Sequence, residues 1–581
     1  MFIKQRVAFL LSCICLSAAV CSANPALAQD AKTDQLQRQI DSLQEQLQSL
    51  KRQVAQTKKD ADKAQQTAQN AQKPPQDGQQ APPGLYNAAL PMPTKAGPSF
   101  LDTIHVSFAG SYAAVETAWR QRNEISSGAS DPAFSALPFS NTPLYTEHEF
   151  RASAQQSRIA IKLSGDIDPA NHLKAYFETD FLGAGVTANS RESNSYNLRI
   201  RQAFGEYDND NWHFHLVGGQ AWSLLTQNKV GMLPQTENTP LTIDAQYVVG
   251  FNWARQPQIR FVEDINQTLW FGVSVESPQA AIGGTLPTAG PDFPLVVNAA
   301  NNCNNSGLLN SATFCSNDIA PDVVEKVALD PGWGHYEAFA VERWFADQVS
   351  PFVNATTPAN WSTQTTFGWD VGGSVLLPVV PKFLDLQGNV TYGDGGGRYG
   401  SSQLSDVTYG SDGSLTPLKY LSAMVGAVAH PWPALTVYAY AGQERVNANS
   451  FGAGTAALGG GGYGNPLFAN NGCLLANPAY PNNPGGIGAG SFNSPITGST
   501  CTANVQKTQE ITVGFWHDLY KGNLGELVFG AQYEYVRLTA FSTECGFHGA
   551  VGCTPGPIST PNQGLNPNNN IFFTSLRYYP F

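Results

Sequence analysis

The chain has 581 residues, a formal net charge of −12 and 13% charged residues, whereas ordinary soluble domains carry about 25%. Aromatic residues make up 11%, too many for a disordered chain, and the acidic balance disfavours a nucleic-acid partner because phosphate contacts need a basic surface. After residue 21 no stretch approaches the roughly 18 apolar residues that a membrane-spanning helix needs.

The first 28 residues have the pattern of a secretory signal peptide. They comprise a charged start at Lys4 and Arg6, a mostly apolar stretch over 7–20 and a small-x-small cleavage site at 26–28. A short membrane anchor is the alternative interpretation. The signal predicts an exported protein.

The cysteines agree with export. Three of the nine lie in the signal, and the remaining six form three close pairs, 12, 28 and 8 positions apart. An even number in an exported chain favours disulfides. A metal cluster is disfavoured because no CxxC or HxxxH spacing occurs, so we expect no metal and no cofactor. The expected bridges are Cys303–Cys315, Cys473–Cys501 and Cys545–Cys553.

Residues 29–72 carry a heptad pattern. Apolar residues from Leu36 to Ala71 alternate spacings of four and three over five heptads, with glutamine-rich flanks. This seam favours a self-associating coiled coil over a lone solvated helix. Residues 73–98 contain seven prolines and read as an extended linker, because proline fixes φ and removes a hydrogen-bond donor.

Residues 99–581 show period-two alternation, with one apolar and one polar face per segment. Seven short and eight long connections alternate, which gives sixteen strands. The fold predicted is an all-β transmembrane barrel of 16 antiparallel strands with an N-terminal α-helical coiled coil. A soluble sandwich or propeller would show an internal repeat, and none is found. The short connections are 168–171, 208–211, 263–266, 330–333, 378–382, 430–434 and 520–523, and the long ones are 116–156, 183–195, 223–251, 277–320, 347–365, 394–416, 447–505 and 541–568.

Two features support this barrel. All three cysteine pairs fall within long connections, where crosslinks would hold exposed loops. The chain ends in an aromatic strand, 571–581, whose terminal Phe581 is the usual recognition mark of bacterial outer-membrane barrels, although Pro580 is unusual there.

The layout of signal, coiled coil, proline-rich linker and barrel resembles the DcaP-like porins over roughly residues 30 to 581. The resemblance implies a homotrimeric outer-membrane channel with its coiled coil in the periplasm, surrounded by outer-membrane lipid and lipopolysaccharide. Peptidoglycan is a further candidate partner for the coiled coil. The segments that carry the resemblance are Lys174-Ala175-Tyr176-Phe177-Glu178 with Asp180-Phe181, Leu198 to Ala203, Gly219 to Ser223, Trp333-Gly334-His335, and Val390 to Gly393 followed by Gly397-Arg398-Tyr399.

Strand parity predicts a cationic wall in the lumen. If Ile159 and Leu163 face lipid, the cations that alternate with the apolar residues of strands two to four face the pore on neighbouring strands. The third long connection, 223–251, is expected to fold into the lumen as an inserted loop and to place acidic side chains opposite these cations. Alternatively, the acids neutralise the cations and the pore is not anion-selective. The expected lining residues are Arg158, Lys162, Lys174, Arg199, Arg201 and Arg260, with the acids Glu178, Asp180, Glu237 and Asp244.

The function expected is passive diffusion of small anionic solutes such as dicarboxylates. The alternative is a structural tether from the outer membrane to the cell wall through the coiled coil, with a non-selective pore. An enzyme is not expected, because the common serine-hydrolase, zinc-protease and P-loop motifs do not occur. His105 with Ser107 lacks the residues of a phospholipase site, and His213 with His215 lacks a third metal ligand nearby.

Overall fold

The computed structural model describes residues 104–580 with gaps at 109, 125–133, 135–136, 139–142, 184–196, 245–246, 285, 287–293, 299–317, 352–359, 453–460, 467–503 and 543–565. The predicted signal peptide, coiled coil, linker, six barrel cysteines and Phe581 lie outside the described residues. Among the residues described, no helix has both the length and the apolar character to cross a bilayer.

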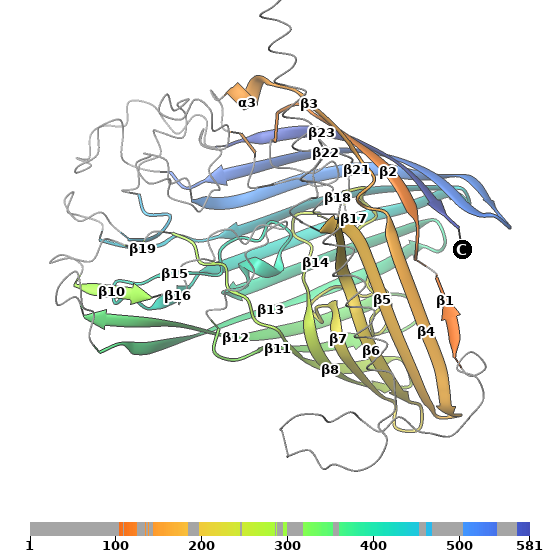
Figure 1. Ribbon diagram of the computed structural model, residues 1–581, viewed down its shortest axis with the longest axis horizontal. Coiled ribbons are helices and arrows are strands. Elements are labelled where there is room, and N and C mark those ends of the chain that lie inside the picture. Colours follow the sequence, from red (N-terminus) through yellow and green to blue (C-terminus); the bar gives the residue numbers. More distant parts are fainter. Residues whose placement is uncertain are drawn as a thin grey trace, which may run out of the picture. The chain divides into compact units, whose positions relative to one another are not determined.

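The described chain is built almost wholly of antiparallel strands, nineteen of which form one sheet (Figure 1). Two small two-stranded sheets and the short helices α3 (Pro143–Thr146) and η2 (Gly397–Tyr399) lie in connections. The strands of the first half are β1 (His105–Ser107), β2 (Ala113–Arg120), β3 (Glu149–Ser153), β4 (Arg158–Asp168), β5 (Asn171–Gly183), β6 (Asn197–Asn209), β7 (Phe214–Trp222), β8 (Arg255–Ile265), β9 (Leu269–Glu276), β10 (Leu295–Asn298) and β11 (Asp322–Leu329). The strands of the second half are β12 (His335–Pro351), β13 (Ser362–Val380), β14 (Leu384–Asp394), β15 (Val407–Tyr409), β16 (Leu415–Pro417), β17 (Lys419–Trp432), β18 (Leu435–Val446), β19 (Asn449–Phe451), β20 (Gly461–Tyr463), β21 (Val505–Gly522), β22 (Gly525–Ala540) and β23 (Asn568–Tyr579).

Strands that follow one another in the chain pair with one another in the sheet. The ladder runs without a break from β4 to β9, continues through β11, β12, β13, β14, β17, β18, β21, β22 and β23, and then pairs β23 with β2. On its other edge β2 pairs with β3, while β1 pairs with β4 and Tyr112 forms a single bridge to Arg158.

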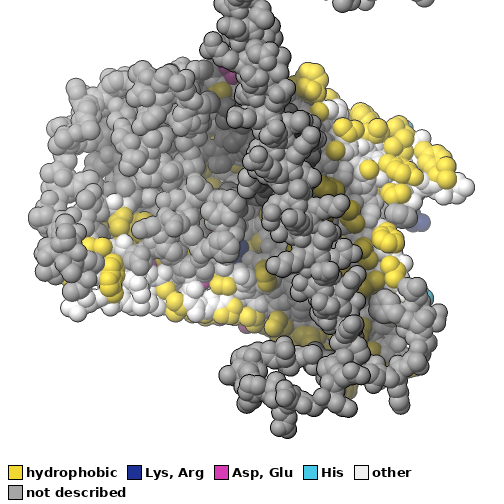
Figure 2. All heavy atoms as spheres, in the orientation of Figure 1, with side chains coloured by type: hydrophobic (Ala, Val, Ile, Leu, Met, Phe, Trp, Pro, Cys, Tyr) yellow, Lys and Arg dark blue, Asp and Glu magenta, His cyan; other side chains and the backbone are white. Residues whose placement is uncertain are grey.

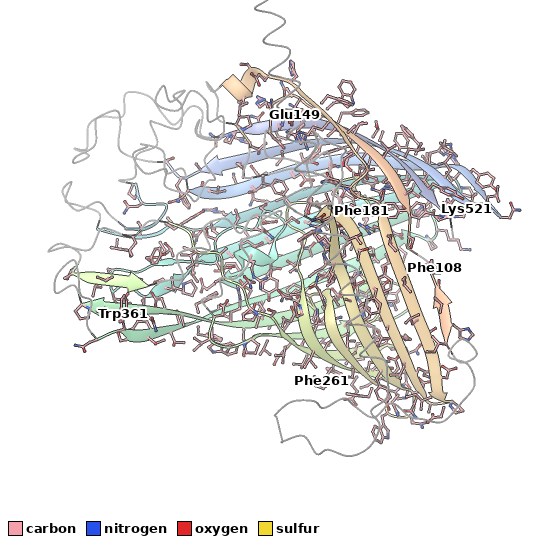
Figure 3. The ribbon with its side chains drawn as sticks, in the orientation of Figure 1. Phe108, Glu149, Phe181, Phe261, Trp361 and Lys521 are labelled. Atoms are coloured by element: carbon pink, nitrogen blue, oxygen red, sulfur yellow. The ribbon has the colours of Figure 1, made fainter. Side chains whose placement is uncertain are left out.

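The alternation of short and long connections is as the sequence predicts. Each predicted short turn joins two paired strands, although the turn predicted at 263–266 lies at 266–268. Lys521, in one of these turns, lies on the opposite side of the view from Trp361, the last residue before β13 (Figure 3). Several predicted loop boundaries are wrong, and the short strands β10, β15, β19 and β20 lie within predicted loops. The strands β2 and β3 extend into the predicted loop 116–156, and β12 and β13 extend into 347–365, because tight pairing carries these strands past the end of the apolar pattern.

The two faces of the sheet differ in polarity. On the outer face Ile159, Phe177 and Ile200 are 45%, 50% and 60% exposed, whereas Glu178 and Arg201 on the other, inner, face are 5% and 2% exposed. Figure 2 shows hydrophobic side chains gathered at the right-hand side and along the lower margin of the face in view. Relative to a soluble protein, the polarity is inverted, because apolar residues lie on the outer face and charged residues on the inner face. Period-two alternation along each strand produces this arrangement.

Exposed aromatic residues gather near the ends of the strands on the outer face. Trp212, Trp333 and Trp432 lie at short turns and are 74%, 64% and 52% exposed. Near the long connections, Trp119 packs against Phe150, with ring centroids 4.3 Å apart and ring planes tilted by 50°.

A β-bulge in β6 changes which side chains point inward. Glu178 pairs with Gln202 and Thr179 with Ile200, so Arg201 is the extra residue. As a result both Arg201 and Gln202 are buried on the inner face.

Candidate functional site: the inner wall and its inserted loop

Residues 223–254, here called the inserted loop, connect β7 to β8 and lie against the inner face of the sheet. Its backbone N–H groups are satisfied by inward carboxylates and amides from strands all along the ladder, as buried backbone donors must be. The amide of Leu224 donates to Glu276 at 2.9 Å. Further along the loop, the amides of Asn228, Ile243, Val249 and Gly250 donate to Glu337, Gln532, Glu510 and Glu444 at 2.7 to 2.9 Å.

Apolar packing fixes the second half of the inserted loop. Tyr247, Val248 and Phe251 are fully buried in one cluster with inward residues of β17 and β18. Gly250 has φ +90°, and a Cβ there would overlap the carbonyl oxygen of Ala423 in β17. Only glycine fits this close approach of the loop to the wall without strain.

Three of the predicted cations form one ion-paired group, here called the arginine cluster: Arg158, Arg199 and Arg201 with Glu178 and Asp180. Arg199 binds Asp180 at two points, and Arg201 contacts Glu178 and also Asp180, at 3.1 Å for the latter. Arg158 Nη1 lies 3.9 Å from Glu178 Oε2. The structure therefore places these residues on one wall, as parity predicts, but supplies carboxylates within the same group.

The two predicted lysines lie on the same face but apart from the arginine cluster. Lys174 Nζ is 2.8 Å from Glu206 and 2.7 Å from Asp208. Lys162 is exposed and lies opposite Tyr176 in the ladder.

Arg260 binds the inserted loop. Its guanidinium is fully buried and donates to the carbonyl oxygens of Met232, at 2.8 Å, and Trp222, at 2.6 Å. Arg260 therefore anchors the loop, and these N–H donors are already bonded to the protein's own carbonyl oxygens.

The two predicted acids of the inserted loop lie in different places. Glu237 has electrostatic neighbours in Arg260 and Glu178, and burial raises the pKa of Glu237 to about 7. Asp244 is fully buried against β22, where it accepts a hydrogen bond from Gln532 at 3.2 Å, and burial also raises its pKa. Only Glu237 lies towards the arginine cluster.

Arg255, which sequence reasoning did not select, lies beside the arginine cluster. It faces Trp222 across the β7–β8 ladder, and its guanidinium carbon is 5.0 Å from the ring centroids of both Trp222 and Trp253. The two tryptophans stand at 89° to each other. A tryptophan at each end of a long connection is a signal in the sequence that could have pointed here.

The histidines noted in the sequence are paired with carboxylates. His215 contacts Asp208 at 2.6 Å and Asp264 at 3.3 Å, and His213 lies 3.5 Å from Asp264. Within the ranges that the structure describes, no group of three or more histidine, cysteine or acidic residues is arranged to hold a metal ion.

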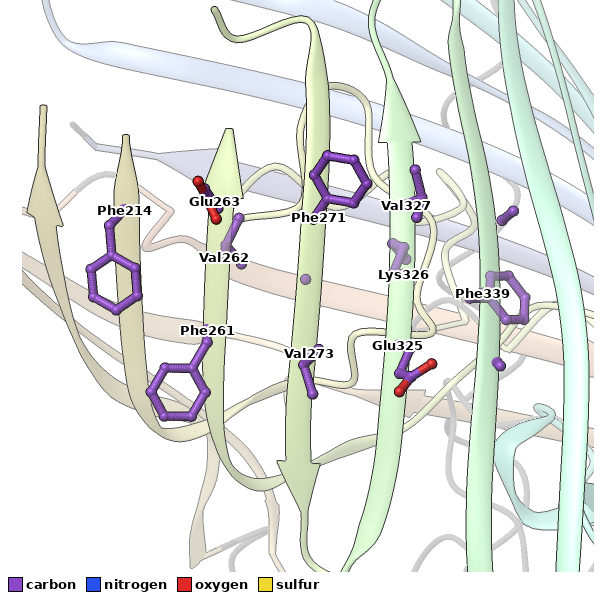
Figure 4. Close-up of a pocket in the computed structure, with 13 residues that line it drawn as sticks. Phe214, Phe261, Val262, Glu263, Phe271, Val273, Glu325, Lys326, Val327 and Phe339 are labelled. Carbon is purple, nitrogen blue, oxygen red and sulfur yellow. The ribbon is translucent and has the colours of Figure 1, made fainter. Parts of the chain in front are cut away.

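The outer face also carries a groove, of about 560 Å³, that is separate from the inner wall. Phe214 and Phe261 lie to one side of it, and Glu325 lies on β11 towards its other side (Figure 4). Ala338 and Ala340 of β12 complete its lining.

No protein-family profile matches the chain, and neither does any curated protein sequence. Solved structures do resemble it. The outer-membrane channel DcaP of Acinetobacter baumannii has a TM-score of 0.48 and 15% identity, and the match covers 82% of this chain and 97% of that one. The anion-selective porin from Comamonas acidovorans has a TM-score of 0.40 and 11% identity, covering 82% and 99%. OprB of Pseudomonas putida has a TM-score of 0.40 and 10% identity, covering 82% and 94%.

Proposed function

We propose that the chain is a DcaP-like porin, a passive channel of the bacterial outer membrane that favours small anions. The observation that carries the proposal is the inverted polarity of the sheet: its outer face is apolar and exposed, and its inner face is charged and ion-paired. A water-filled or ligand-carrying interior inside an apolar exterior is the arrangement of a transmembrane barrel.

The strand pairing supports a closed barrel of sixteen strands. The ladder returns from β23 to β2 and on to β3. In this interpretation β1 and β2 are two parts of one interrupted strand, and so are β3 and β4. The short strand β10 pairs only with the end of β12 and is not counted as a separate barrel strand. Sixteen of the nineteen sheet elements then remain as separate strands.

The aromatic residues support a membrane position. Trp212, Trp333 and Trp432 would form one interfacial girdle at the periplasmic turns, and the Trp119–Phe150 pair would contribute to the other. The long connections, with their cysteine pairs, would then face the outside of the cell.

A modest excess of cations supports anion preference. The arginine cluster and Arg255 together carry four guanidinium groups against two carboxylates. Because the carboxylates neutralise part of the wall, we propose a preference for anions rather than strict selection, with small dicarboxylates among the solutes.

We further propose that the chain is a homotrimer with residues 29–72 as a periplasmic coiled coil. Glu325 supports contact between protomers on the outer face, because a carboxylate facing hydrocarbon is costly. A neighbouring protomer seated over Ala338 and Ala340 in the groove of Figure 4 would remove Glu325 from lipid.

Planar-bilayer recording of the full-length protein tests the function. In a KCl gradient at low salt we expect stepwise conductance and a reversal potential on the chloride side. Raising the salt to 1 M should weaken the preference, because the Debye length falls to about 3 Å. Channels that prefer potassium at low salt would reject anion selectivity, and membranes that stay silent would reject the porin.

A further inference from the structure

We propose that Arg255, held in the corner between Trp222 and Trp253, is an anion-binding residue of the channel and takes the carboxylate of a passing solute. The proposal rests on the proposed porin function and adds the residue that binds the anion.

The first step is that the guanidinium of Arg255 has no counterion of its own. Its Nε and Nη1 atoms are buried and have no hydrogen-bond partner, and within the described residues no carboxylate lies within ion-pair distance of it. By contrast, Arg199 and Arg201 each contact a carboxylate. A buried cation without a partner costs several kcal/mol, so an arginine kept in this state points to an anion that is supplied from outside.

The second step is that the surroundings of Arg255 favour a guest anion over a carboxylate of the protein. Of the charged groups around it, Arg201 and Arg199 act on it more strongly than Asp180 does. Two of its charged neighbours are therefore guanidinium groups, although each of these is itself paired with a carboxylate. An anion that enters between Arg255 and Arg199 would be attracted by both guanidinium groups.

The third step is that the tryptophans hold and insulate the guanidinium. Trp222 and Trp253 are 3% and 7% exposed, and Tyr247 packs on Trp253 with ring centroids 4.9 Å apart. The rings fix the plane of the guanidinium and exclude water from it, which strengthens its attraction for an anion. The Nε and Nη1 atoms are buried, but the residue as a whole is only half-buried, so a solute can approach the side chain from its exposed side.

These steps identify the ligand by its chemistry as a small carboxylate, because a planar guanidinium with free donors binds a carboxylate at two points. Succinate is a suitable probe, and chloride is a control because a single spherical ion lacks the two oxygen atoms that match the parallel N–H donors of a guanidinium. Removing the charge of Arg255 should weaken succinate more than chloride.

The test uses full-length wild-type protein, Arg255→Gln, and Arg445→Gln as matched control, because Arg445 is an exposed, outward residue of β18. Two quantities are measured for each protein. One is the block of the channel current by succinate, and the other is the quenching of tryptophan fluorescence by succinate in detergent. We expect Arg255→Gln to raise the half-effective succinate concentration about tenfold in both measurements, and Arg445→Gln to change neither. Equal succinate affinity in wild type and Arg255→Gln would overturn the proposal.

One further outcome separates this proposal from the porin function. Binding of succinate that depends on Arg255 in a protein that does not conduct would keep the anion site and reject the porin. If Arg255→Gln does not assemble, Arg255→Lys is measured instead. It keeps the charge but loses the two-point geometry, so succinate block should weaken several-fold while chloride permeability is kept. Unchanged block in Arg255→Lys would reject the two-point site.

Discussion

Arg199 and Asp180 face each other across the β5–β6 ladder and form a two-point ion pair, with Nε 3.0 Å from Oδ1 and Nη2 2.7 Å from Oδ2. The same carboxylate contacts Arg201. The wall that carries most of the predicted cations therefore also carries their counterions. In the proposed channel, ion selectivity would depend on the small difference between these positive and negative charges, so that single substitutions should change it strongly.

The first prediction concerns this balance. Replacing Arg199 and Arg201 by alanine removes two positive charges and leaves Glu178 and Asp180 facing the lumen. Each pair interaction is worth on the order of 1 kcal/mol at about 4 Å in water, and several act together, so the chloride-to-potassium permeability ratio should fall tenfold or more. Reversal potentials in a low-salt gradient measure this ratio.

The control for this double variant is Arg199→Ala alone. After this single substitution the buried carboxylate of Asp180 keeps its contact with Arg201 at 3.1 Å, so the single variant leaves less uncompensated charge in a buried place. It should assemble normally and lower the ratio by a smaller factor. An unchanged ratio in both variants would show that these arginines do not set selectivity.

The order of the strands could be predicted from the sequence, because period-two alternation and turn residues are local signals. The same alternation predicts Glu178 and Asp180 on the inner face, but which cation each of these acids binds could not be predicted. The bulge that turns both Arg201 and Gln202 inward arises from pairing with β5, and the binding of Arg260 to the carbonyl oxygens of Met232 and Trp222 depends on how the inserted loop folds back. Arg255 was missed for the same reason, since the corner that holds it forms only when both ends of the loop meet.

The second prediction concerns the disulfides, whose cysteines lie outside the described residues. Bridges Cys303–Cys315, Cys473–Cys501 and Cys545–Cys553 each close a short loop, worth about 3 kcal/mol in the chain-entropy model. Reduction should therefore increase proteolysis of the long connections while the heat-modifiable barrel persists. Peptide mapping under non-reducing conditions checks the pairing, and a bridge between two different connections would contradict it.

The third prediction concerns the coiled coil. Deleting residues 29–72 should leave folded trimers, because the contacts between barrels should suffice without the heptad seam. Cross-linking and unheated gel electrophoresis of the deleted and intact proteins measure this. Monomers in the deleted protein alone would show that the coil holds the trimer together, and monomers in both would reject the trimer.

The fourth prediction concerns Gly250 of the inserted loop. Gly250→Ala places a Cβ against the carbonyl oxygen of Ala423 at a φ of +90°, so the loop must move away from β17. Limited proteolysis within residues 223–254 should become faster, while the heat-modifiability of the barrel is kept. Gly218→Ala is the matched control, since a Cβ there meets nothing within 4 Å. Equal protection of the loop in both variants would contradict the close packing of loop and wall.

The last prediction concerns pH and Glu237. Burial raises the pKa of its carboxyl from 4.5 to about 7, so the docked loop binds a proton more tightly than an undocked loop does. Binding of the inserted loop to the inner wall is therefore most favourable below pH 4.5 and weakens as the pH rises from 4.5 to 7. Above pH 7 the carboxyl must be ionised in its buried position, so the loop is bound least stably there. Hydrogen exchange of the amides around Glu237, corrected for intrinsic rates, should show less protection at pH 8 than at pH 5. Glu237→Gln keeps the shape of the side chain and removes the titration, so its protection should be the same at both values.

Asp412→Asn is the control, because Asp412 is an acid of another connection whose pKa is lowered by hydrogen bonds from Ser414, and it should leave the pH response of the inserted loop intact. A pH response that survives in Glu237→Gln would assign the titration to another buried acid of the loop, with Asp244 the first to replace.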